Sequence, residues 1–247
     1  MFGYMTRKAL LMRLIGRERP AFFLEVGFGR GDWLLTLSTM GHHGVGLDTS
    51  RYAARLLKEN LPESRTSIDL IVGNIQQITF IEKFDLVFAF EVLEHIDDDN
   101  MVIDKIASLL RTGGQFIFSV PAHAKLWTKH DEMVGHFRRY ERRALVAKLK
   151  SNGFRVRVIW CYGFPFGNLL LPLRSLAASW MPKMTTQERT EISGTFRPLE
   201  DRFRRILVIA FKVLLPLQLR IQEHFLETDI GNGYVVVAEK STLRSAN

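Results

Sequence analysis

Cysteine is almost absent from this sequence of 247 residues, since Cys161 is the only one. A single cysteine excludes an intramolecular disulfide, and no group of cysteines and histidines has the spacing typical of a zinc site. We therefore expect the protein to bind no metal. A chain without disulfides suits the reducing cytosol, so cytoplasmic is the location we expect.

Long apolar runs are also lacking. The most apolar segments, residues 164–173 and 206–219, are interrupted or ended by charged residues and prolines before they reach the roughly 18 residues of a membrane-spanning helix. Residues 1–20 alternate basic with apolar residues and have neither the continuous apolar segment nor the small-residue cleavage site of a signal peptide. We expect no membrane span, and residues 1–20 form either an amphipathic helix that covers a sheet or a helix on a membrane surface.

Acidic residues are scarce in the second part of the chain. Residues 1–136 contain 15 Lys and Arg against 17 Asp and Glu, whereas residues 137–247 contain 19 against 9, and the net charge is +8. A basic half could face nucleic acid, an anionic membrane surface or an acidic small molecule, or it is simply a solvated surface. A hydrophobic content of 47% is enough for a sizeable core, so we expect one α/β domain over residues 1–247.

The most informative stretch runs from residue 22 to residue 48. Residues 22–26 form a short apolar run typical of a buried strand. Three glycines follow, at positions 27, 29 and 31. Glycine adopts positive φ and has no Cβ, so a ligand can contact the bare backbone of this turn. Asp32 comes next, and we expect it to cap the following helix.

The spacing of these glycines separates two kinds of cofactor. The dinucleotide fingerprint G-x-G-x-x-G requires a third glycine at position 32, where this chain has Asp32. A pyrophosphate would meet a carboxylate at the helix start, which argues against NAD and FAD. A second predicted strand, residues 44–48, ends in Asp48. A carboxylate there can accept hydrogen bonds from both hydroxyls of a ribose.

The pattern Glu25-x-Gly27-x-Gly29-x-Gly31 resembles the first motif of class I S-adenosylmethionine-dependent methyltransferases. The resemblance implies S-adenosylmethionine as the cofactor, with Glu25 facing its ammonium group. It also implies that Asn74, just past the third strand, contacts the adenine, although the family usually has Asp there and a simple turn role stays open. The cofactor-binding residues expected are Glu25, Gly27, Phe28, Gly29, Gly31, Asp48, Thr49, Asn74, Ile75 and Glu91.

The rest of the chain alternates predicted strands with predicted helices. The strands are expected at 68–72, 84–90, 115–120, 155–160 and 234–239, and the helices at 49–60, 100–110 and 141–151. This order favours a doubly wound, mostly parallel sheet with right-handed crossovers. With the resemblance, it predicts an α/β, Rossmann-like methyltransferase fold of seven strands, with the last strand antiparallel and a helical insertion before it.

Two further segments resemble the small-molecule methyltransferases of ubiquinone and menaquinone biosynthesis. The sequence EVLEHI, residues 91–96, follows the strand 84–90, and GHFRRY occupies residues 135–140. The methyl group and its acceptor should meet at the carboxyl end of that strand. The Asn/Asp-Pro-Pro-Tyr/Phe segment of nucleic-acid amino-methyltransferases is absent there. We therefore expect a small-molecule acceptor, lipophilic or anionic, and consider nucleic acid a less favoured partner.

A hydroxyl, protonated amine or carbon acid requires a base before it can accept a methyl group, and histidine suits this role because its pKa lies near neutrality. His95 and His136 are the candidate catalytic residues, although Glu94 and His95 could instead cap a helix and bond the cofactor loop. Asp97, Asp98 and Asp99 read as a solvated helix start and not as a metal site.

Acceptor binding is assigned to residues near the same histidines, namely Glu94, His123, Arg138, Arg139 and Tyr140. Guanidinium groups bind carboxylates and phosphates bidentately, so the arginines could anchor an anionic acceptor. The alternative is that they are helix-start residues tied to Asp131 or Glu132.

The segment 163–232 is the least typical of the family. It has three interpretations: a helical lid over the acceptor, the face of a homodimer, or a surface that dips transiently into a membrane to collect a lipid-like acceptor. Two other functions also stay open. One is an S-adenosylmethionine-binding regulatory protein without catalysis, and the other is a nucleic-acid-directed methyltransferase.

Overall fold

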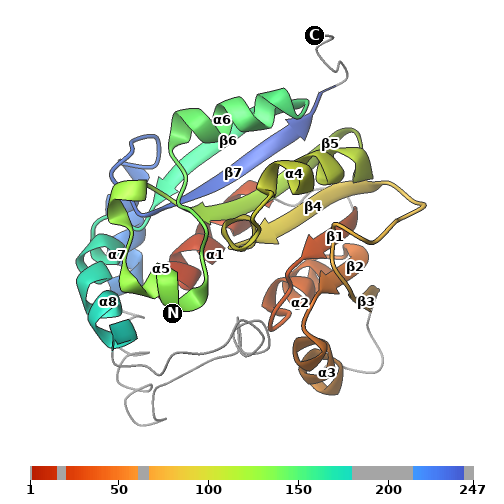
Figure 1. Ribbon diagram of the computed structural model, residues 1–247, viewed down its shortest axis with the longest axis horizontal. Helices are drawn as coiled ribbons and strands as arrows, with labels where there is room; N and C mark the ends of the chain where they lie inside the picture. The colour runs from red at the N-terminus through yellow and green to blue at the C-terminus, as the bar shows by residue number, and fades with distance from the viewer. Residues whose placement is uncertain (1, 16–20, 61–66, 180–213, 242–247) are drawn as a thin grey trace.

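The structure, a computed structural model, describes residues 2–15, 21–60, 67–179 and 214–241. Its centre is a seven-stranded sheet of order β3-β2-β1-β4-β5-β7-β6 (Figure 1). The strands are β1 (Phe22–Val26), β2 (His43–Asp48), β3 (Ile68–Val72), β4 (Phe84–Phe90), β5 (Leu110–Pro121), β6 (Phe154–Tyr162) and β7 (Gly233–Lys240). The pairs from β3 to β5 are parallel, and β7 runs antiparallel to both β5 and β6. The predicted fold class and the antiparallel last strand are thus confirmed.

Helices cover both faces of this sheet. They are α1 (Phe2–Ile15), α2 (Asp32–Thr39), α3 (Arg51–Asn60), α4 (Asp99–Leu109), α5 (Lys129–Val134), α6 (Arg142–Ser151), α7 (Phe166–Leu169) and α8 (Leu171–Ser179), and residues 214–223 are also helical. One apolar layer joins α4 and α6 to the sheet through side chains such as Ile103 and Leu149. The other joins α1, α2 and α3 to the opposite face through Leu11, Leu34 and Leu57.

The amino-terminal helix α1 lies against the sheet. Leu10, Leu11 and Ile15 are buried and belong to the same apolar layer as Phe23 and Phe88. Of the two interpretations of residues 1–20, this is the helix that covers the sheet. Residues 16–20 lie outside the described part of the chain.

One expectation about helix starts is wrong, that Asp32 caps α2, and a second, the solvated helix start at Asp97, Asp98 and Asp99, is wrong for Asp99. Gly31, in a left-handed conformation, is the N-cap of α2, and Asp32 is the first helical residue. At α4 the side chain of Asp98 caps the helix by accepting a hydrogen bond from the Met101 N–H. Asp99 is not solvated, because it is only 2% exposed and its carboxylate accepts a hydrogen bond from the Tyr140 hydroxyl.

In the segment 163–232 the structure describes α7, α8 and helix 214–223, whereas residues 224–232 form turns and bends. Two buried glutamines of helix 214–223 hold it to the chain that follows β6: the Oε1 of Gln222 accepts from Gly163 N–H at 2.7 Å, and that of Gln218 accepts from Phe166 N–H at 3.2 Å. Residues 180–213 of this segment lie outside the described residues. Among the residues that are described, none of the helices combines the length and apolar character required to cross a membrane.

Candidate functional site

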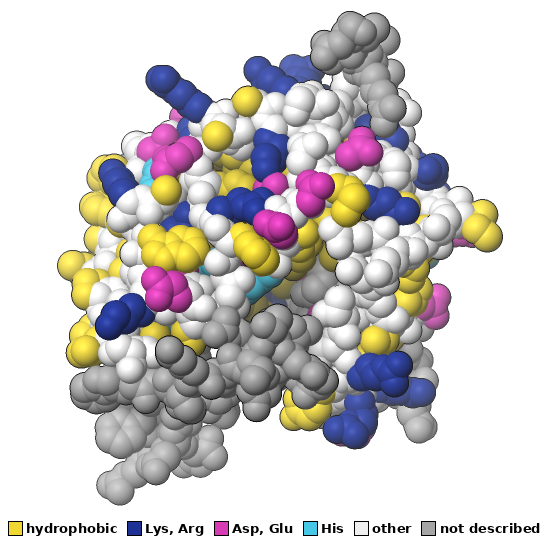
Figure 2. All heavy atoms as spheres, in the orientation of Figure 1, with side chains coloured by type: hydrophobic (Ala, Val, Ile, Leu, Met, Phe, Trp, Pro, Cys, Tyr) yellow, Lys and Arg dark blue, Asp and Glu magenta, His cyan; other side chains and the backbone are white. Residues whose placement is uncertain are grey.

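The candidate site lies at the carboxyl ends of β1, β2, β4 and β5. Because these strands are parallel, the segments that follow them all meet at one edge of the sheet. Figure 2 shows that the surface is hollowed beside this edge, with histidine side chains in the wall of the hollow. The site therefore forms where the glycine turn and the EVLEHI segment come together.

The register of β1 and β2 brings the glycine turn beside Asp48. Val26 pairs with Leu47, so Gly27 follows one strand where Asp48 follows the other. The N–H of Gly27 donates to Leu47 O at 2.7 Å, and the N–H of Gly29 donates to Asp48 Oδ2 at 2.8 Å. The two features that the sequence assigned to one cofactor are thus in direct contact.

The turn between β1 and α2 strongly favours glycine at two positions. Gly27 and Gly31 have φ values of 72° and 71°, which side chains rarely adopt. A Cβ on Gly27 would lie 2.6 Å from Val92 Cγ2, and one on Gly31 would lie 2.4 Å from Leu57 Cδ2. Neighbouring side chains therefore pack closely against the turn at both positions.

Glu25 is a buried carboxylate in β1, only 2% exposed. Its Oε2 atom has no hydrogen-bond partner among the described residues. Burial, with a contribution from the nearby Asp48, raises the pKa of Glu25 well above its usual range. A cationic group placed beside Glu25 would relieve this cost, and the ammonium group of S-adenosylmethionine is such a group.

The other expected cofactor residues frame the same edge. Asn74 Oδ1 accepts from the Gln76 N–H at 2.9 Å, which is the turn role that the sequence left open. Ile75 and Phe28 are buried, and Thr49 is exposed. The amide oxygen of Asn74 is therefore engaged within its own turn.

The carboxylate of Glu91, just after the end of β4, takes part in several hydrogen bonds and an ion pair. The residue has a positive backbone φ of 57°, which is uncommon outside glycine. Its Oε1 accepts hydrogen bonds from the hydroxyls of Ser119 at 2.8 Å and Tyr162 at 3.3 Å, and it lies 2.9 Å from Arg7 Nη1. Burial raises the pKa of Glu91, but the positive charge of Arg7, the hydrogen bond from Ser119 and other positive charges nearby together outweigh burial, so the pKa is lowered overall.

Arg7, Ser119 and Tyr162 are site residues that the sequence did not indicate. They come from α1, β5 and β6, and no shared motif links such distant positions. Only the pairing of β4 with β5 could have indicated Ser119 as a site residue, because Ser119 lies opposite Phe90 in that register. No comparable signal exists for Arg7.

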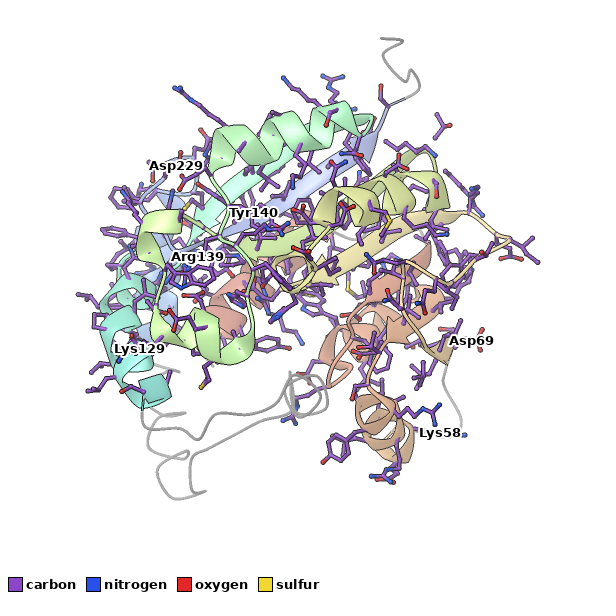
Figure 3. All side chains as sticks on the ribbon, viewed as in Figure 1. Lys58, Asp69, Lys129, Arg139, Tyr140 and Asp229 are labelled. Atoms are coloured by element: carbon purple, nitrogen blue, oxygen red, sulfur yellow. The ribbon has the colours of Figure 1, made fainter. Side chains whose placement is uncertain are left out.

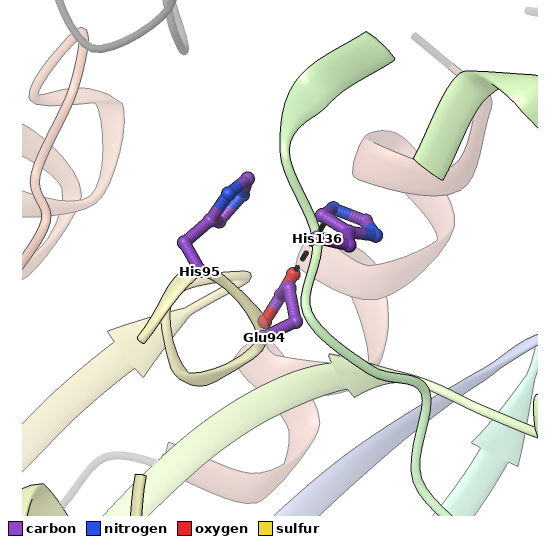
Figure 4. A group of neighbouring side chains, drawn as sticks. All are labelled: Glu94, His95 and His136. Carbon is purple, nitrogen blue, oxygen red and sulfur yellow. Dashed lines mark ion pairs between the residues drawn. The ribbon is translucent and has the colours of Figure 1, made fainter. Parts of the chain in front are cut away.

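Figure 4 shows how Glu94, His95 and His136 lie together. Glu94 and His95 belong to the 3₁₀ turn Leu93–His95 after β4, whereas His136 follows α5. The imidazoles of His95 and His136 meet edge to face with centroids 4.7 Å apart, and His136 Nε2 lies 3.8 Å from Glu94 Oε1. The two histidines expected to be catalytic are therefore brought together.

Burial dominates the electrostatics of this cluster. Glu94 is fully buried, and burial together with the charge of Glu91 raises its pKa well above the usual range. Neither Glu94 carboxylate oxygen has a hydrogen-bond partner among the described residues. Burial, aided by His136, lowers the pKa of His95 to about 4. His95 is therefore neutral at pH 7, and one of its ring nitrogens can accept a proton or a hydrogen bond.

Asp131 orients His136. Its Oδ1 lies 2.8 Å from His136 Nδ1, and its two oxygens also accept from Arg139 Nε at 3.0 Å and Nη2 at 2.9 Å. Burial raises the pKa of Asp131, but the hydrogen bonds from His136 and Arg139 outweigh it, so the pKa lies below its usual range. Arg139 is thus tied to Asp131, which is one of the two alternatives predicted for the arginines.

Arg138 and Tyr140 also make contacts within the chain. Arg138 Nη1 lies 2.7 Å from Asp99 Oδ1, and the Tyr140 hydroxyl donates to Asp99 Oδ2 at 2.9 Å. Figure 3 shows Arg139 and Tyr140 on the segment between α5 and α6. His123 lies farther along the sheet edge, with Nδ1 3.2 Å from Glu141 Oε2. The five residues expected at the acceptor thus divide between the histidine cluster and the surrounding framework.

In the part of the chain that the structure describes, two groups of side chains have ligand atoms close enough to hold a metal ion. In each group, three ligand atoms lie within 4.8 Å of one another. The groups are Glu94 with His95 and His136, and His123 with Cys161 and Asp229. The sequence spacing did not indicate either group as a metal site, since each group joins residues that lie far apart in the sequence. The expected absence of a metal therefore stays a prediction.

The fold and the edge together define a class of protein. A parallel sheet of this order, a glycine turn after β1 and a carboxylate at the end of β2 match the resemblance to class I S-adenosylmethionine-dependent methyltransferases. A protein-family model described as a methyltransferase domain matches residues 2–158. The chain therefore belongs to this methyltransferase family, whose cofactor is S-adenosylmethionine.

Known proteins agree with this assignment. The ubiquinone biosynthesis O-methyltransferase of Chelativorans sp. is 32% identical over 221 residues, which cover 89% of this chain and 71% of that protein. The protein of the same name from Bradyrhizobium diazoefficiens is 30% identical over 96 residues, so the match spans 39% of this chain and 38% of that relative. The solved S-adenosylmethionine-dependent methyltransferase of Mesorhizobium loti has a TM-score of 0.60 at 14% identity, over 95% of this chain and 97% of that chain. At that identity the structure supports the fold alone.

Proposed function

We propose that this protein transfers the methyl group of S-adenosylmethionine to a hydroxyl oxygen of a small, lipophilic aromatic acceptor. The acceptor lies between the glycine turn and the cluster of Glu94, His95 and His136. The proposal of an oxygen acceptor draws on the relatives, which are named ubiquinone biosynthesis O-methyltransferases. The observation that carries the proposal is the contact of the Gly29 N–H with the Asp48 carboxylate, since it joins the two halves of one cofactor site.

The residues of this edge suit the cofactor. Asp48 would hold the ribose, and Glu25, whose buried Oε2 lacks a partner among the described residues, would face the ammonium group. Gly27, Gly29 and Gly31, which carry no side chain, would let the methionyl end approach the backbone of the turn, while Phe28, Thr49, Asn74 and Ile75 would line the nucleoside end. When bound, S-adenosylmethionine supplies an electrophilic methyl group, so the protein chiefly has to align the acceptor and exclude water.

His136 is the base in this proposal. Asp131 holds its Nδ1 at 2.8 Å, so the proton of that nitrogen is fixed and Nε2 is the atom that can take a proton. The acceptor hydroxyl would give its proton to Nε2 as the oxygen–methyl bond forms and the methyl–sulfur bond of the cofactor breaks, which would leave the sulfur as a neutral thioether. His95, neutral and edge to face with His136, positions the acceptor and excludes water. Arg138, Arg139 and Tyr140 act as a framework that holds this segment in place.

We further propose that the segment 163–232 is a lid over the acceptor. Exposed apolar side chains support this role, since Leu169, Leu173 and Leu176 are 67%, 61% and 53% exposed. A lipophilic acceptor would cover part of this surface. A homodimer face and a transient contact with a membrane surface are the alternatives, and light scattering and sedimentation with anionic vesicles distinguish them from a lid.

The experiment that tests the function follows isotope from the labelled methyl group of S-adenosylmethionine. The acceptors are phenols with and without an alkyl chain, matched alkylated anilines, and an RNA oligonucleotide. We expect label on the phenol oxygen, with higher kcat/KM for the alkylated phenol, and a loss of 10²–10⁴-fold in kcat for His136→Ala. Label on RNA supports the nucleic-acid alternative. Cofactor binding without transfer to any acceptor supports the non-catalytic one.

A further inference from the structure

A second group of chemically reactive side chains lies at the opposite end of the same sheet edge. His123 follows β5, Cys161 lies near the end of β6, and Asp229 precedes β7. One ligand atom from each of these three side chains lies within 4.8 Å of the other two. The sheet explains why they meet, because Pro121 and Tyr162 both pair with Gly233 of β7.

The imidazole of His123 is satisfied on one side only. Nδ1 lies 3.2 Å from Glu141 Oε2, whereas Nε2 is buried and has no hydrogen-bond partner among the described residues. The residue is 5% exposed, and its φ of 62° lies in the left-handed region. A buried nitrogen without a partner costs free energy. A histidine that binds a metal typically has its other nitrogen on a carboxylate, which is the place Glu141 occupies.

The sulfur of Cys161 lies close to the imidazole of His123. Cys161 is buried, and a Cβ built on Gly231 would lie 2.8 Å from its Sγ, so only glycine allows the chain to pass this close. The Gly231 N–H also donates toward the thiol, although burial raises the pKa of Cys161 to about 12. A backbone N–H aimed at sulfur is a contact that stabilises a metal-bound thiolate.

Asp229 supplies the third side chain (Figure 3). Arg142 Nε donates to its Oδ1 at 2.6 Å, and the Tyr234 hydroxyl donates to the same oxygen at 3.0 Å. Oδ2 takes part in neither contact. The side chain of Asp229 is 47% exposed, so it has room to turn.

We propose that His123, Cys161 and Asp229 bind a divalent transition metal ion of the zinc class. The ligands are Nε2 of the imidazole, the thiolate and a carboxylate oxygen, with water as the fourth, and these are ligand types that zinc takes in proteins. Thiolate and carboxylate together balance the two positive charges of the ion. Binding releases the thiol proton to solvent. Ligand atoms around tetrahedral zinc lie about 3–4 Å apart. The three ligand atoms would therefore move about 1 Å closer to one another when the ion binds.

The ion would fasten the ends of β5 and β6 to the turn before β7. Cys161 is followed directly by Tyr162, whose hydroxyl donates to Glu91 at 3.3 Å. The metal would therefore act as a structural support for this wall of the acceptor site. It would take no part in methyl transfer.

Cobalt(II) absorption tests this proposal, and the sequence makes the test specific. Cys161 is the only cysteine of the chain, so a sulfur-to-cobalt charge-transfer band can come from this site alone. We expect the band after one equivalent of Co²⁺ is added to the full chain, and Zn²⁺ should displace it. Cys161→Ser should abolish the band. His123→Ala and Asp229→Asn should weaken Co²⁺ binding at least tenfold, and Glu141→Gln about 10–100-fold.

His95→Ala is the matched control, because the cluster of Glu94, His95 and His136 contains no sulfur. It should leave the charge-transfer band unchanged, and far-ultraviolet circular dichroism should show that every variant is folded. Two results would overturn the proposal. One is the absence of the band in the wild-type protein with one equivalent of Co²⁺. The other is a band of undiminished affinity in folded His123→Ala and Asp229→Asn.

Discussion

The guanidinium of Arg7 lies 2.9 Å from Glu91 Oε1, and this ion pair joins the amino-terminal helix to the end of β4. The same carboxylate oxygen accepts hydrogen bonds from Ser119 and Tyr162. Four separate elements thus meet at one oxygen atom, beside the edge where cofactor and acceptor bind in the proposed function. Helix α1 is therefore part of the wall of the site as well as a cover for the sheet.

Loss of the Arg7 charge should destabilise the protein. The side chains of Arg7 and Glu91 are 12% and 31% exposed, so Arg7→Met leaves a largely buried carboxylate unpaired, at a cost of about 2–4 kcal/mol. Arg13→Met is the control on the same helix, because Arg13 pairs with Glu223 where both side chains are about half exposed, and it should cost less than about 1 kcal/mol. Urea denaturation measures both. Equal losses of unfolding free energy would show that the Arg7–Glu91 pair stabilises the protein no more than the exposed Arg13–Glu223 pair does.

The fold was largely predictable because each strand is a short apolar run bounded by turn residues. The runs 68–72 and 84–90 coincide with β3 and β4, and the antiparallel last strand followed from the family resemblance. Strand ends were less predictable: β5 begins at Leu110, five residues before the expected start, because Leu110 pairs with Phe84 beyond an irregularity in the ladder.

The contacts of the site were less predictable than its location. The glycine turn and Asp48 could be read from local sequence, since both follow apolar strands. Contacts between distant elements could not, because spacing in the sequence does not say which strand ends become neighbours. Asp99 illustrates this, as its position among three aspartates suggested solvent, whereas Tyr140 holds it in the interior.

Asp131 should hold the histidine cluster in place. Asp131→Asn removes the charge that Arg139 and His136 share, so we expect a loss of about 3 kcal/mol in unfolding free energy and a fall in kcat larger than any change in KM. Asp97→Asn, at a side chain that is 87% exposed, serves as the control. If kcat stays at the wild-type value in a folded Asp131→Asn protein, Asp131 does not orient the base.

Acid should destabilise the protein through His95. The unfolded chain protonates this histidine near pH 6.5, whereas the folded protein, with a pKa of about 4, does so only at lower pH. Its contribution is therefore complete above pH 6.5 and falls as pH drops toward 4, by at most about 3 kcal/mol. The difference in unfolding free energy between wild type and His95→Asn should change across that window. A His95→Asn curve parallel to wild type would refute this account.

Gly31 should tolerate no side chain. Gly31→Ala combines a positive φ with a Cβ 2.4 Å from Leu57 Cδ2, whereas Gly113→Ala has a similar φ of 77° and no atom within 4 Å. Gly113→Ala should therefore cost about 1–2 kcal/mol from backbone strain alone. We expect a larger loss for Gly31→Ala, together with weaker cofactor binding, in thermal unfolding with and without S-adenosylmethionine. Equal losses, with cofactor binding intact, would mean that the turn is not under steric constraint.

The central claim is that the glycine turn and Asp48 form one site for S-adenosylmethionine. Isothermal titration calorimetry of Asp48→Asn tests it most directly, with Asp69→Asn, an exposed carboxylate on the neighbouring β3, as the control. We expect Kd to rise about 10–100-fold for Asp48→Asn, because charged hydrogen bonds to the ribose are lost, and to stay within about twofold of wild type for Asp69→Asn. An unchanged Kd for Asp48→Asn would contradict the account.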